Sequence, residues 1–291
     1  MTAPMSRRSL LHGGLGVAAI GLGGRALAGC GDPGTVRAGG GPKLDMGIVS
    51  PNLAANVPQR LVFVLRNKDN DLIAPTGLEV RVSRSDTKLG VLAPAEVHTD
   101  AAPAPAYVSA TVTIPDTGVS YIQVRAKEGT AVGAIQAVVA PRGVQTGQAM
   151  PAVPTPTVTD ALGIEALCTH IPPCDLHTMT LGDALKTNRP LAVLVATPAF
   201  CQTAVCGPVL DILLSNLPKL RPDLLAMHLE VYAKRPSGPE ISATPLSPAV
   251  RALGLESEPV LFLVGANGIV AAKLDGIVGT AELTRAVGAL P

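Results

Sequence analysis

The chain has 291 residues, a formal net charge of +1 and 15% charged residues. A nearly neutral chain of this kind gives no electrostatic reason to expect a nucleic-acid partner. Aromatic residues make up only 2% of the sequence, so the core has to be built from Val, Leu, Ile and Ala, which this length allows. The length predicts about two domains.

Residues 1–29 have the features of an export signal rather than of a folded element. Ser6-Arg7-Arg8-Ser9-Leu10-Leu11 resembles a twin-arginine motif, and a Gly-rich apolar run too short for a transmembrane helix follows it. Leu27-Ala28-Gly29-Cys30 resembles the lipobox of bacterial lipoproteins. This resemblance implies that Cys30 becomes the lipidated N-terminus, whereas the alternative is an ordinary cleaved signal peptide. Residues 30–43 then form a flexible tether.

Residues 44–140 read as an all-β domain. The third candidate strand alternates cleanly, with Val108, Ala110, Val112 and Ile114 on one face, and turn-forming residues separate the candidates. The candidate strands are Arg60–Leu65, Leu78–Ser83, Tyr107–Ile114, Val119–Arg125 and Val132–Val139. Five candidate strands in about a hundred residues favour an immunoglobulin-like (Ig-like) sandwich, although the Cys–Trp–Cys signature is absent. A Pro/Thr-rich linker follows at residues 141–162.

Residues 163–291 alternate between helical and strand patterns. Thr180 and Ser247 are expected to cap short helices, and Thr280 a final helix that runs to Leu290. Asn267-Gly268 predicts a tight turn between two strands. The remaining expected elements are strands at Leu191–Ala196, Asp223–Tyr232, Val260–Val264 and Ile269–Leu274, and a helix at Cys206–Leu217. The sequence therefore predicts an α/β domain.

Cys201 and Cys206 stand where the buried strand Leu191–Ala196 gives way to a helix. Exposed N–H groups and the helix dipole stabilise a thiolate at such a position. Five residues of continuous helix rise about 7.5 Å, which is too far for a disulfide, so the pair can bridge only if Cys201 lies in the loop or the first turn of the helix unwinds. Two interpretations remain open: Cys201 attacks and Cys206 resolves, or the pair is a permanent disulfide.

The order of these elements, with a cysteine between strand and helix, resembles the thioredoxin fold. Thioredoxins carry Trp-Cys-Gly-Pro-Cys, whereas Phe200 replaces the Trp here and four residues separate the cysteines. Cys206-Gly207-Pro208-Val209 can also be aligned on that motif, which would make Cys206 the nucleophile. The resemblance implies that Glu258-Pro259 holds the cis-proline of the family, and that Pro259 belongs to the active site; a trans proline at a strand start is the alternative.

A second group of candidate residues lies upstream, where Cys168, His170, Cys174 and His177 fall within ten residues. Such a set could ligate zinc or copper. An exported pair of thiols usually oxidises, and two prolines tighten the loop, so a structural Cys168–Cys174 disulfide is the preferred prediction. His98 and His228 are interpreted as isolated residues, and Asp211 as a solvated or capping residue.

Together these features predict an exported, lipid-anchored thiol–disulfide oxidoreductase on the extracytoplasmic face of the cell membrane. They resemble thioredoxin-like lipoproteins of high-GC Gram-positive bacteria. The expected partners are protein thiols or disulfides, or a membrane electron donor, together with the bilayer through Cys30; no cofactor is expected. The main alternative is a non-catalytic binding or scaffold lipoprotein with two structural disulfides.

Two other enzyme or carrier classes fit less well. A peroxiredoxin-like peroxidase needs Pro-x-x-x-Thr-x-x-Cys, but Leu194 and Pro198 stand at the Pro and Thr positions. A copper-delivery protein of the thioredoxin fold needs Cys-x3-Cys, which differs by one residue from the spacing of Cys201 and Cys206.

Overall fold

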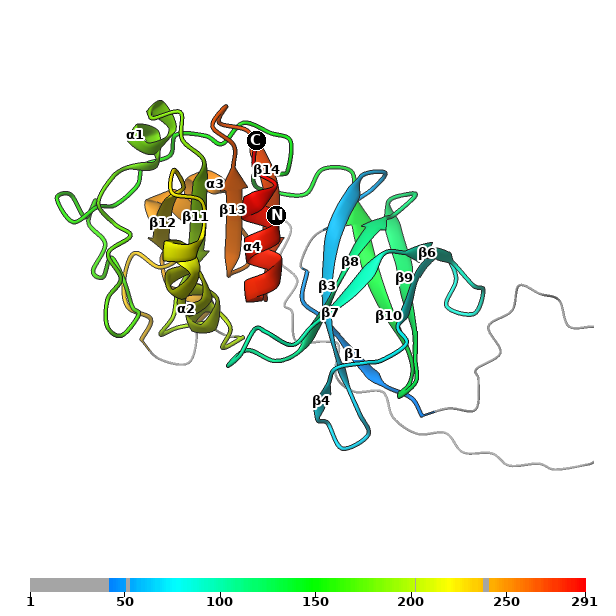
Figure 1. Cartoon of the computed structure of the whole chain (residues 1–291). Coiled ribbons are helices and arrows are strands. Elements are labelled where there is room, and N and C mark those ends of the chain that lie inside the picture. Colours follow the sequence, from blue (N-terminus) through cyan, green and yellow to red (C-terminus); the bar gives the residue numbers. More distant parts are fainter. Residues whose placement is uncertain (1–41, 51–52, 202, 238–240) are drawn as a thin grey trace, which may run out of the picture. The chain divides into compact units, whose positions relative to one another are not determined.

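The computed structural model describes residues 42–50, 53–201, 203–237 and 241–291 (Figure 1). The predicted export signal, Cys30 and most of the predicted tether lie outside these described residues. Among the residues that the structure describes, none of the helices combines the length and apolar character needed to cross a bilayer.

The N-terminal domain is a sandwich of two sheets. One sheet has the order β1-β3-β8-β7, with β4 paired to β3, and the other has the order β2-β10-β9-β5-β6. Its strands are β1 Asp45–Ile48, β2 Leu53–Ala54, β3 Pro58–Arg66, β4 Leu72–Ile73, β5 Glu79–Ser83, β6 Val91–Ala93, β7 Ala95–His98, β8 Tyr107–Thr113, β9 Gly118–Ala126 and β10 Gly129–Val138. This is the strand order of an Ig-like sandwich, with A, B, E and D in one sheet and C, F and G in the other. The predicted Ig-like sandwich is confirmed.

Buried and exposed side chains alternate along β8, and this pattern explains which face of the strand packs against the second sheet. Val108, Ala110 and Val112 are all at most 3% exposed, whereas Thr111 and Thr113 between and beyond them face solvent. The buried set packs into one core with side chains from both sheets, including Phe63 of β3. The period-2 pattern therefore selects the face that the second sheet covers.

The C-terminal domain contains a four-stranded sheet of order β12-β11-β13-β14. Strands β11 and β12 are parallel, whereas β13 is antiparallel to both β11 and β14. Its elements are α1 Leu181–Lys186, β11 Leu191–Ala196, α2 Cys206–Asn216, a 3-10 turn Leu217–Lys219, β12 Leu225–Glu230, a 3-10 turn Ile241–Ala243, α3 Pro248–Leu253, β13 Val260–Val264, β14 Val270–Asp275 and α4 Thr280–Gly288. In this half of the chain every predicted strand and helix is present, and each of its ends lies within two residues of the predicted position.

Helices cover both faces of this sheet. Alternate residues of β11 explain why: Leu194 and Ala196 pack toward α2 and α4, whereas Val193 and Val195 pack toward α1 and α3. All six residues of β11 are at most 1% exposed. A strand that is buried on both faces reads as a continuous apolar run, which is what Leu191–Ala196 is.

Two of the three predicted helix caps are confirmed and one is wrong. The hydroxyl groups of Thr180 and Ser247 accept hydrogen bonds from backbone N–H groups in the first turns of α1 and α3. Thr280 is instead the first residue of α4, and Gly279 occupies the cap position. A cap is supplied from the sandwich, because the Asp100 carboxylate accepts the hydrogen bond of the Ala281 N–H group.

The Pro/Thr-rich segment 141–162 is packed against the C-terminal domain. The N–H of Met150 donates to Gly268 O at 2.9 Å, and Ala149 forms a bridge with Ile269 beside β14. Val144, Met150 and Val153 are buried in the same core as α1 and α3. Much of the predicted linker is therefore part of the second domain's structure.

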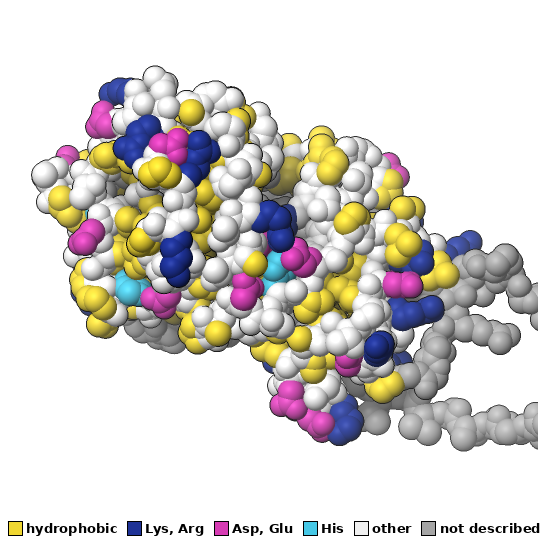
Figure 2. All heavy atoms as spheres, viewed as in Figure 1, with side chains coloured by type: hydrophobic (Ala, Val, Ile, Leu, Met, Phe, Trp, Pro, Cys, Tyr) yellow, Lys and Arg dark blue, Asp and Glu magenta, His cyan; other side chains and the backbone are white. Residues whose placement is uncertain are grey.

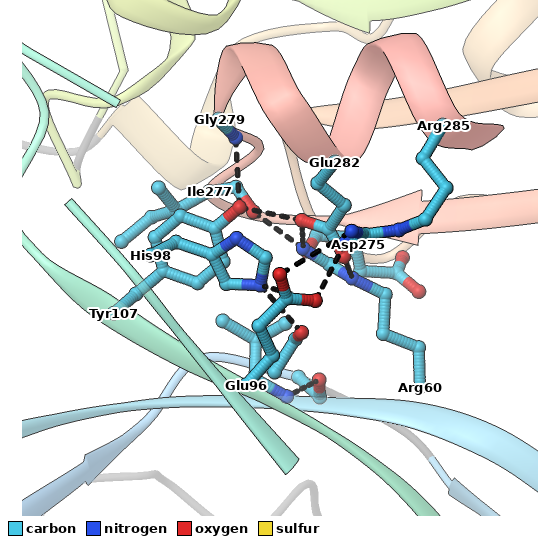
Figure 3. A network of polar contacts seen from close by, with 12 residues as sticks. Arg60, Glu96, His98, Tyr107, Asp275, Ile277, Gly279, Glu282 and Arg285 are labelled. Carbon is cyan, nitrogen blue, oxygen red and sulfur yellow. Dashed lines mark hydrogen bonds and ion pairs between the residues drawn. The ribbon is translucent and has the colours of Figure 1, made fainter. Parts of the chain in front are cut away.

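A polar network connects the two domains (Figure 3). Arg60 of β3 donates two hydrogen bonds of 2.7 Å to the carboxylate of Glu282 in α4, and two more to the carbonyls of Asp275 and Ile277. The Tyr107 hydroxyl donates to Glu282 and accepts from the Gly279 N–H. Burial alone would raise the pKa of Glu282, but the hydrogen bonds and charge of Arg60 outweigh it and lower that pKa.

Candidate functional site

Cys201 and Cys206 form a disulfide at the end of β11. Cys201 lies in the loop after Ala196, and Cys206 is the first residue of α2, with 5.9 Å between their Cα atoms. The chain turns back between them at Ala204, whose φ of 57° is in the left-handed region. Of the two predicted ways for the pair to bridge, a loop position for Cys201 is the one that the structure shows.

The two cysteines of this disulfide differ in burial. Cys206 is 0% exposed, whereas Cys201 is only partly buried. The N–H of Cys206, at the start of α2, donates to Cys201 Sγ over a distance of 3.3 Å. An N–H at a helix N-terminus stabilises negative charge on the sulfur that it contacts. The geometry therefore favours Cys201 over Cys206 as the attacking thiol.

Pro259 lies at the same end of the sheet. The Glu258–Pro259 peptide bond is cis, as the resemblance to thioredoxins implies. Val260 begins β13 and pairs with Val195, so Pro259 stands next to the end of β11 from which the Cys201 loop leaves. Burial raises the pKa of the Glu258 carboxyl, which precedes the proline.

A second cluster brings together Cys168, Cys174, His177 and His228. Their sulfur atoms and one ring nitrogen of each histidine all lie within 4.8 Å of one another. The two sulfurs are 3.6 Å apart, and Cys174 Sγ is 3.3 Å from His177 Nε2 and 3.5 Å from His228 Nδ1. Cys168 Sγ is 3.7 Å from the same His228 nitrogen. Both histidines are buried and both cysteines are partly exposed.

This cluster differs from the prediction in two ways. The predicted Cys168–Cys174 disulfide is not formed, because both residues are free cysteines. His170 is not part of the cluster, since its Nε2 contacts Asp211 Oδ1 of α2 at 2.8 Å and its Nδ1 contacts the carbonyl of Pro172. The second histidine comes instead from β12, sixty residues beyond Cys168 in the chain.

Hydrogen bonds to β12 hold the segment that carries the cysteines. The Glu230 carboxylate accepts from the N–H and the hydroxyl of Thr169, and burial raises the pKa of this carboxyl. The N–H of His228 donates to the carbonyl of Leu176 at 3.1 Å. The Thr169 hydroxyl in turn accepts from the N–H of Ala199, which belongs to the loop that leads to Cys201. The two cysteine sites are therefore neighbours in the fold.

The two thiols of the cluster have different affinities for protons. The hydrogen bond between the two thiols, helped by both histidines, lowers the pKa of Cys168 despite its burial. The same hydrogen bond, together with burial, raises the pKa of Cys174. Cys168 is thus the group that ionises first.

His228 is the member of this cluster that the sequence did not predict. Its signal was present, because it is a histidine inside the strand pattern Asp223–Tyr232, where both neighbours are apolar. A side chain that is 0% exposed at such a position needs a polar partner. What the sequence did not provide is the identity of that partner, which lies in a loop far away along the chain.

Comparison with known proteins adds little to this description. No family model and no curated protein sequence matches the chain. Among solved structures, the Lin-41 filamin domain is similar over 33% of this chain and 93% of its own length, with 12% identity and a TM-score of 0.23. The PKD domain of the human receptor SorCS2 covers 45% of this chain and 100% of its own, at 18% identity and a TM-score of 0.21. TM-scores this low do not establish a common fold, so the Ig-like assignment depends on the strand order.

Proposed function

We propose that the C-terminal domain is thioredoxin-like and that the protein is an exported, membrane-anchored thiol–disulfide oxidoreductase. The observation that carries this proposal is the Cys201–Cys206 disulfide at the junction of β11 and α2, in which Cys201 is partly exposed and Cys206 is completely buried. Access to one sulfur and burial of its partner favour ordered exchange with a second protein.

The arrangement of the C-terminal sheet supports the same proposal. Two parallel strands joined through a helix, followed by an antiparallel hairpin and a final helix, match the element order of the thioredoxin fold. The cis-proline at the start of β13 stands where the thioredoxin resemblance requires it, next to the strand end that leads to Cys201.

The order of the exchange steps follows from the partial exposure of Cys201 and the burial of Cys206. A client thiolate attacks Cys201 Sγ, the sulfur–sulfur bond to Cys206 breaks, and Cys206 leaves as a thiolate that takes up a proton. A second client thiolate then attacks the client sulfur of this mixed disulfide and releases Cys201. The client loses two electrons and gains a disulfide, while the protein is reduced to two thiols. The reverse sequence begins with a Cys201 thiolate, which the Cys206 N–H stabilises.

The place of action follows from the N-terminal sequence. Lipidated Cys30 would hold the chain at the extracytoplasmic face of the cell membrane, with more than one acyl chain needed for stable anchoring. The partners are then protein thiols and disulfides at that face, or a membrane electron donor. On the face drawn in Figure 2 basic and acidic side chains are interspersed.

Trapping of the mixed disulfide tests this proposal. In the reverse sequence the Cys201 thiolate attacks a client disulfide, and Cys206 then resolves the mixed disulfide. In Cys206→Ser this resolving thiol is missing, so a client cysteine remains bonded to Cys201 and appears as a stable adduct by mass spectrometry. The matched variant Cys201→Ser exposes no attacking sulfur and is expected to trap little. Equal trapping by both variants, or trapping by neither, would overturn the proposal.

A second candidate is a non-catalytic scaffold in which the disulfide is a structural crosslink. The complete burial of Cys206 in the core between the sheet and α2 favours this candidate. It predicts that neither cysteine variant forms an adduct and that the disulfide resists reduction until the domain unfolds.

A further inference from the structure

We propose that Cys168, Cys174, His177 and His228 bind one Zn²⁺ ion in a closed tetrahedral site. This site is separate from the proposed exchange chemistry, because none of its four residues belongs to the Cys201–Cys206 disulfide. The ion is expected to be structural, since four protein ligands leave no open position for a reacting water.

The distances between the ligand atoms fit a zinc tetrahedron. With Zn–S of about 2.3 Å and Zn–N of about 2.0–2.1 Å, a tetrahedron has edges of about 3.8 Å between sulfurs and about 3.5 Å between sulfur and nitrogen. The sulfur–sulfur distance here is 3.6 Å, and the three measured sulfur–nitrogen distances are 3.3, 3.5 and 3.7 Å. Hydrogen bonds also bring thiols and imidazoles to such distances, but here all four ligand atoms lie within 4.8 Å of one another, as the ligands of one ion must.

The hydrogen bond on the far side of His228 fixes its ligating atom. His228 Nε2 lies 3.1 Å from the carbonyl oxygen of Ala196. A carbonyl can only accept, so Nε2 carries the proton and Nδ1 presents its lone pair to the two sulfurs. A carbonyl partner of this kind is the usual support of a histidine that ligates a metal. The Cys174 N–H also points at Cys168 Sγ, at 3.5 Å, and so stabilises a thiolate there.

The residue set selects zinc among the common metal ions. Two thiolates and two imidazoles in a tetrahedral arrangement form the Cys2His2 set of structural zinc sites. Ions that prefer oxygen ligands, such as Mg²⁺ and Ca²⁺, find no carboxylate among the four residues. Glu230, the nearest acidic group on the same strand, is already bonded to Thr169.

A zinc ion also explains how an irregular segment is held in place. Residues 139–180 are all described, and apart from one bridge at Ala149 they contain no helix or strand. Loops of this length without regular structure are uncommon in compact domains. An ion shared between Cys168, Cys174 and His177 on this segment and His228 on β12 would fix it to the sheet, since metal binding contributes directly to folding.

The zinc content of the full-length chain in detergent tests the proposal. After reduction, saturation with Zn²⁺ and removal of unbound metal, we expect one Zn²⁺ per chain, and replacement by Co²⁺ should give the visible absorption of a tetrahedral site. Cys174→Ser should weaken zinc binding by at least about 100-fold. The matched control is His170→Asn, which changes a histidine of the same segment outside the cluster and should keep one Zn²⁺.

A measurement on the unaltered protein covers the possibility that Cys174→Ser does not fold. Alkylation mapped by mass spectrometry should find Cys168 and Cys174 unreactive in the zinc-loaded reduced protein, and reactive together after addition of a chelator. The absence of bound zinc, equal zinc content in Cys174→Ser and the wild-type protein, or alkylation of both thiols regardless of zinc would overturn the proposal.

Discussion

The two cysteine pairs have almost the same spacing in sequence but different surroundings in the fold. Cys201 and Cys206 are bonded to each other, and their neighbour is the N–H at the start of α2. Cys168 and Cys174 are free, and their neighbours are two imidazole rings. Export to an oxidising compartment suggested a disulfide for both pairs. The difference teaches that the groups around a thiol pair decide between a disulfide and a metal site, and these groups come from elsewhere in the chain.

The largest expected effect is on the rate of disulfide exchange, which should depend on the Cys201–Cys206 pair. Cys201→Ser removes the accessible sulfur, so the rate of disulfide exchange with a client should fall by at least about 10³-fold. Ser215→Ala, on the same helix but away from its N-terminus, is the control and should exchange at the wild-type rate. The comparison would fail if Cys201→Ser retained the rate of this control in a stopped-flow exchange assay.

The next effect separates the pairs by their response to a chelator. If zinc is free at a hundred times its dissociation constant, its binding stabilises the fold by about 2.7 kcal/mol, and removal should lower the free energy of unfolding by that amount. Urea unfolding with and without chelator measures this decrease in the free energy of unfolding. The same comparison in Cys201→Ser/Cys206→Ser should give an equal decrease, because that double variant keeps all four zinc ligands. A chelator effect absent from both proteins would contradict the comparison.

A smaller effect is expected when the Cys201–Cys206 disulfide is removed. The crosslink closes a short loop, so the loop-entropy model gives a loss of about 2 kcal/mol in the free energy of unfolding. Unfolding of Cys201→Ser/Cys206→Ser in saturating zinc measures this loss without disturbing the other pair. A loss much larger than this would indicate that the disulfide mainly holds the structure together.

The smallest effect is on the pH dependence of stability, and it involves neither cysteine pair. The pKa of Glu282 is lowered, so its contribution to stability is present above the unfolded pKa of about 4.3 and is lost as the pH falls through the lower folded value. Glu282→Gln should therefore be less stable than the wild-type protein at neutral pH, and the two should converge in acid. Unfolding as a function of pH tests this, and a constant difference between the two proteins would contradict it.

The fold was largely predictable because its strongest patterns are local. The alternation in Tyr107–Ile114 and the Asn267-Gly268 turn each predict a feature that the structure contains, and Gly268 adopts the positive φ that such a turn needs. Short strands such as β6 and β7 carry too few residues to show a period. The cap of α4 was missed because Asp100, which supplies it, lies in the other domain.

The candidate site was predictable only in part for the same physical reason. The position of Cys201 follows from the apolar strand before it and the helix after it, which are neighbours in sequence. The cluster around Cys168 depends on His228, which reaches it because β12 lies parallel to β11 with His228 beside Leu194. Such a contact comes from strand pairing across the chain, so the nearby His170 was a misleading candidate.

The midpoint potential of the Cys201–Cys206 pair tests the central claim most directly. It is measured on the full-length protein by trapping and mapping each cysteine across a series of dithiol redox buffers in saturating zinc. A thiol–disulfide oxidoreductase predicts reduction of this pair well above about −300 mV, in the folded protein and without a change at Cys168 or Cys174. If the disulfide opens only below that value, or only as the domain unfolds, the pair is a structural crosslink and the proposed exchange function is contradicted.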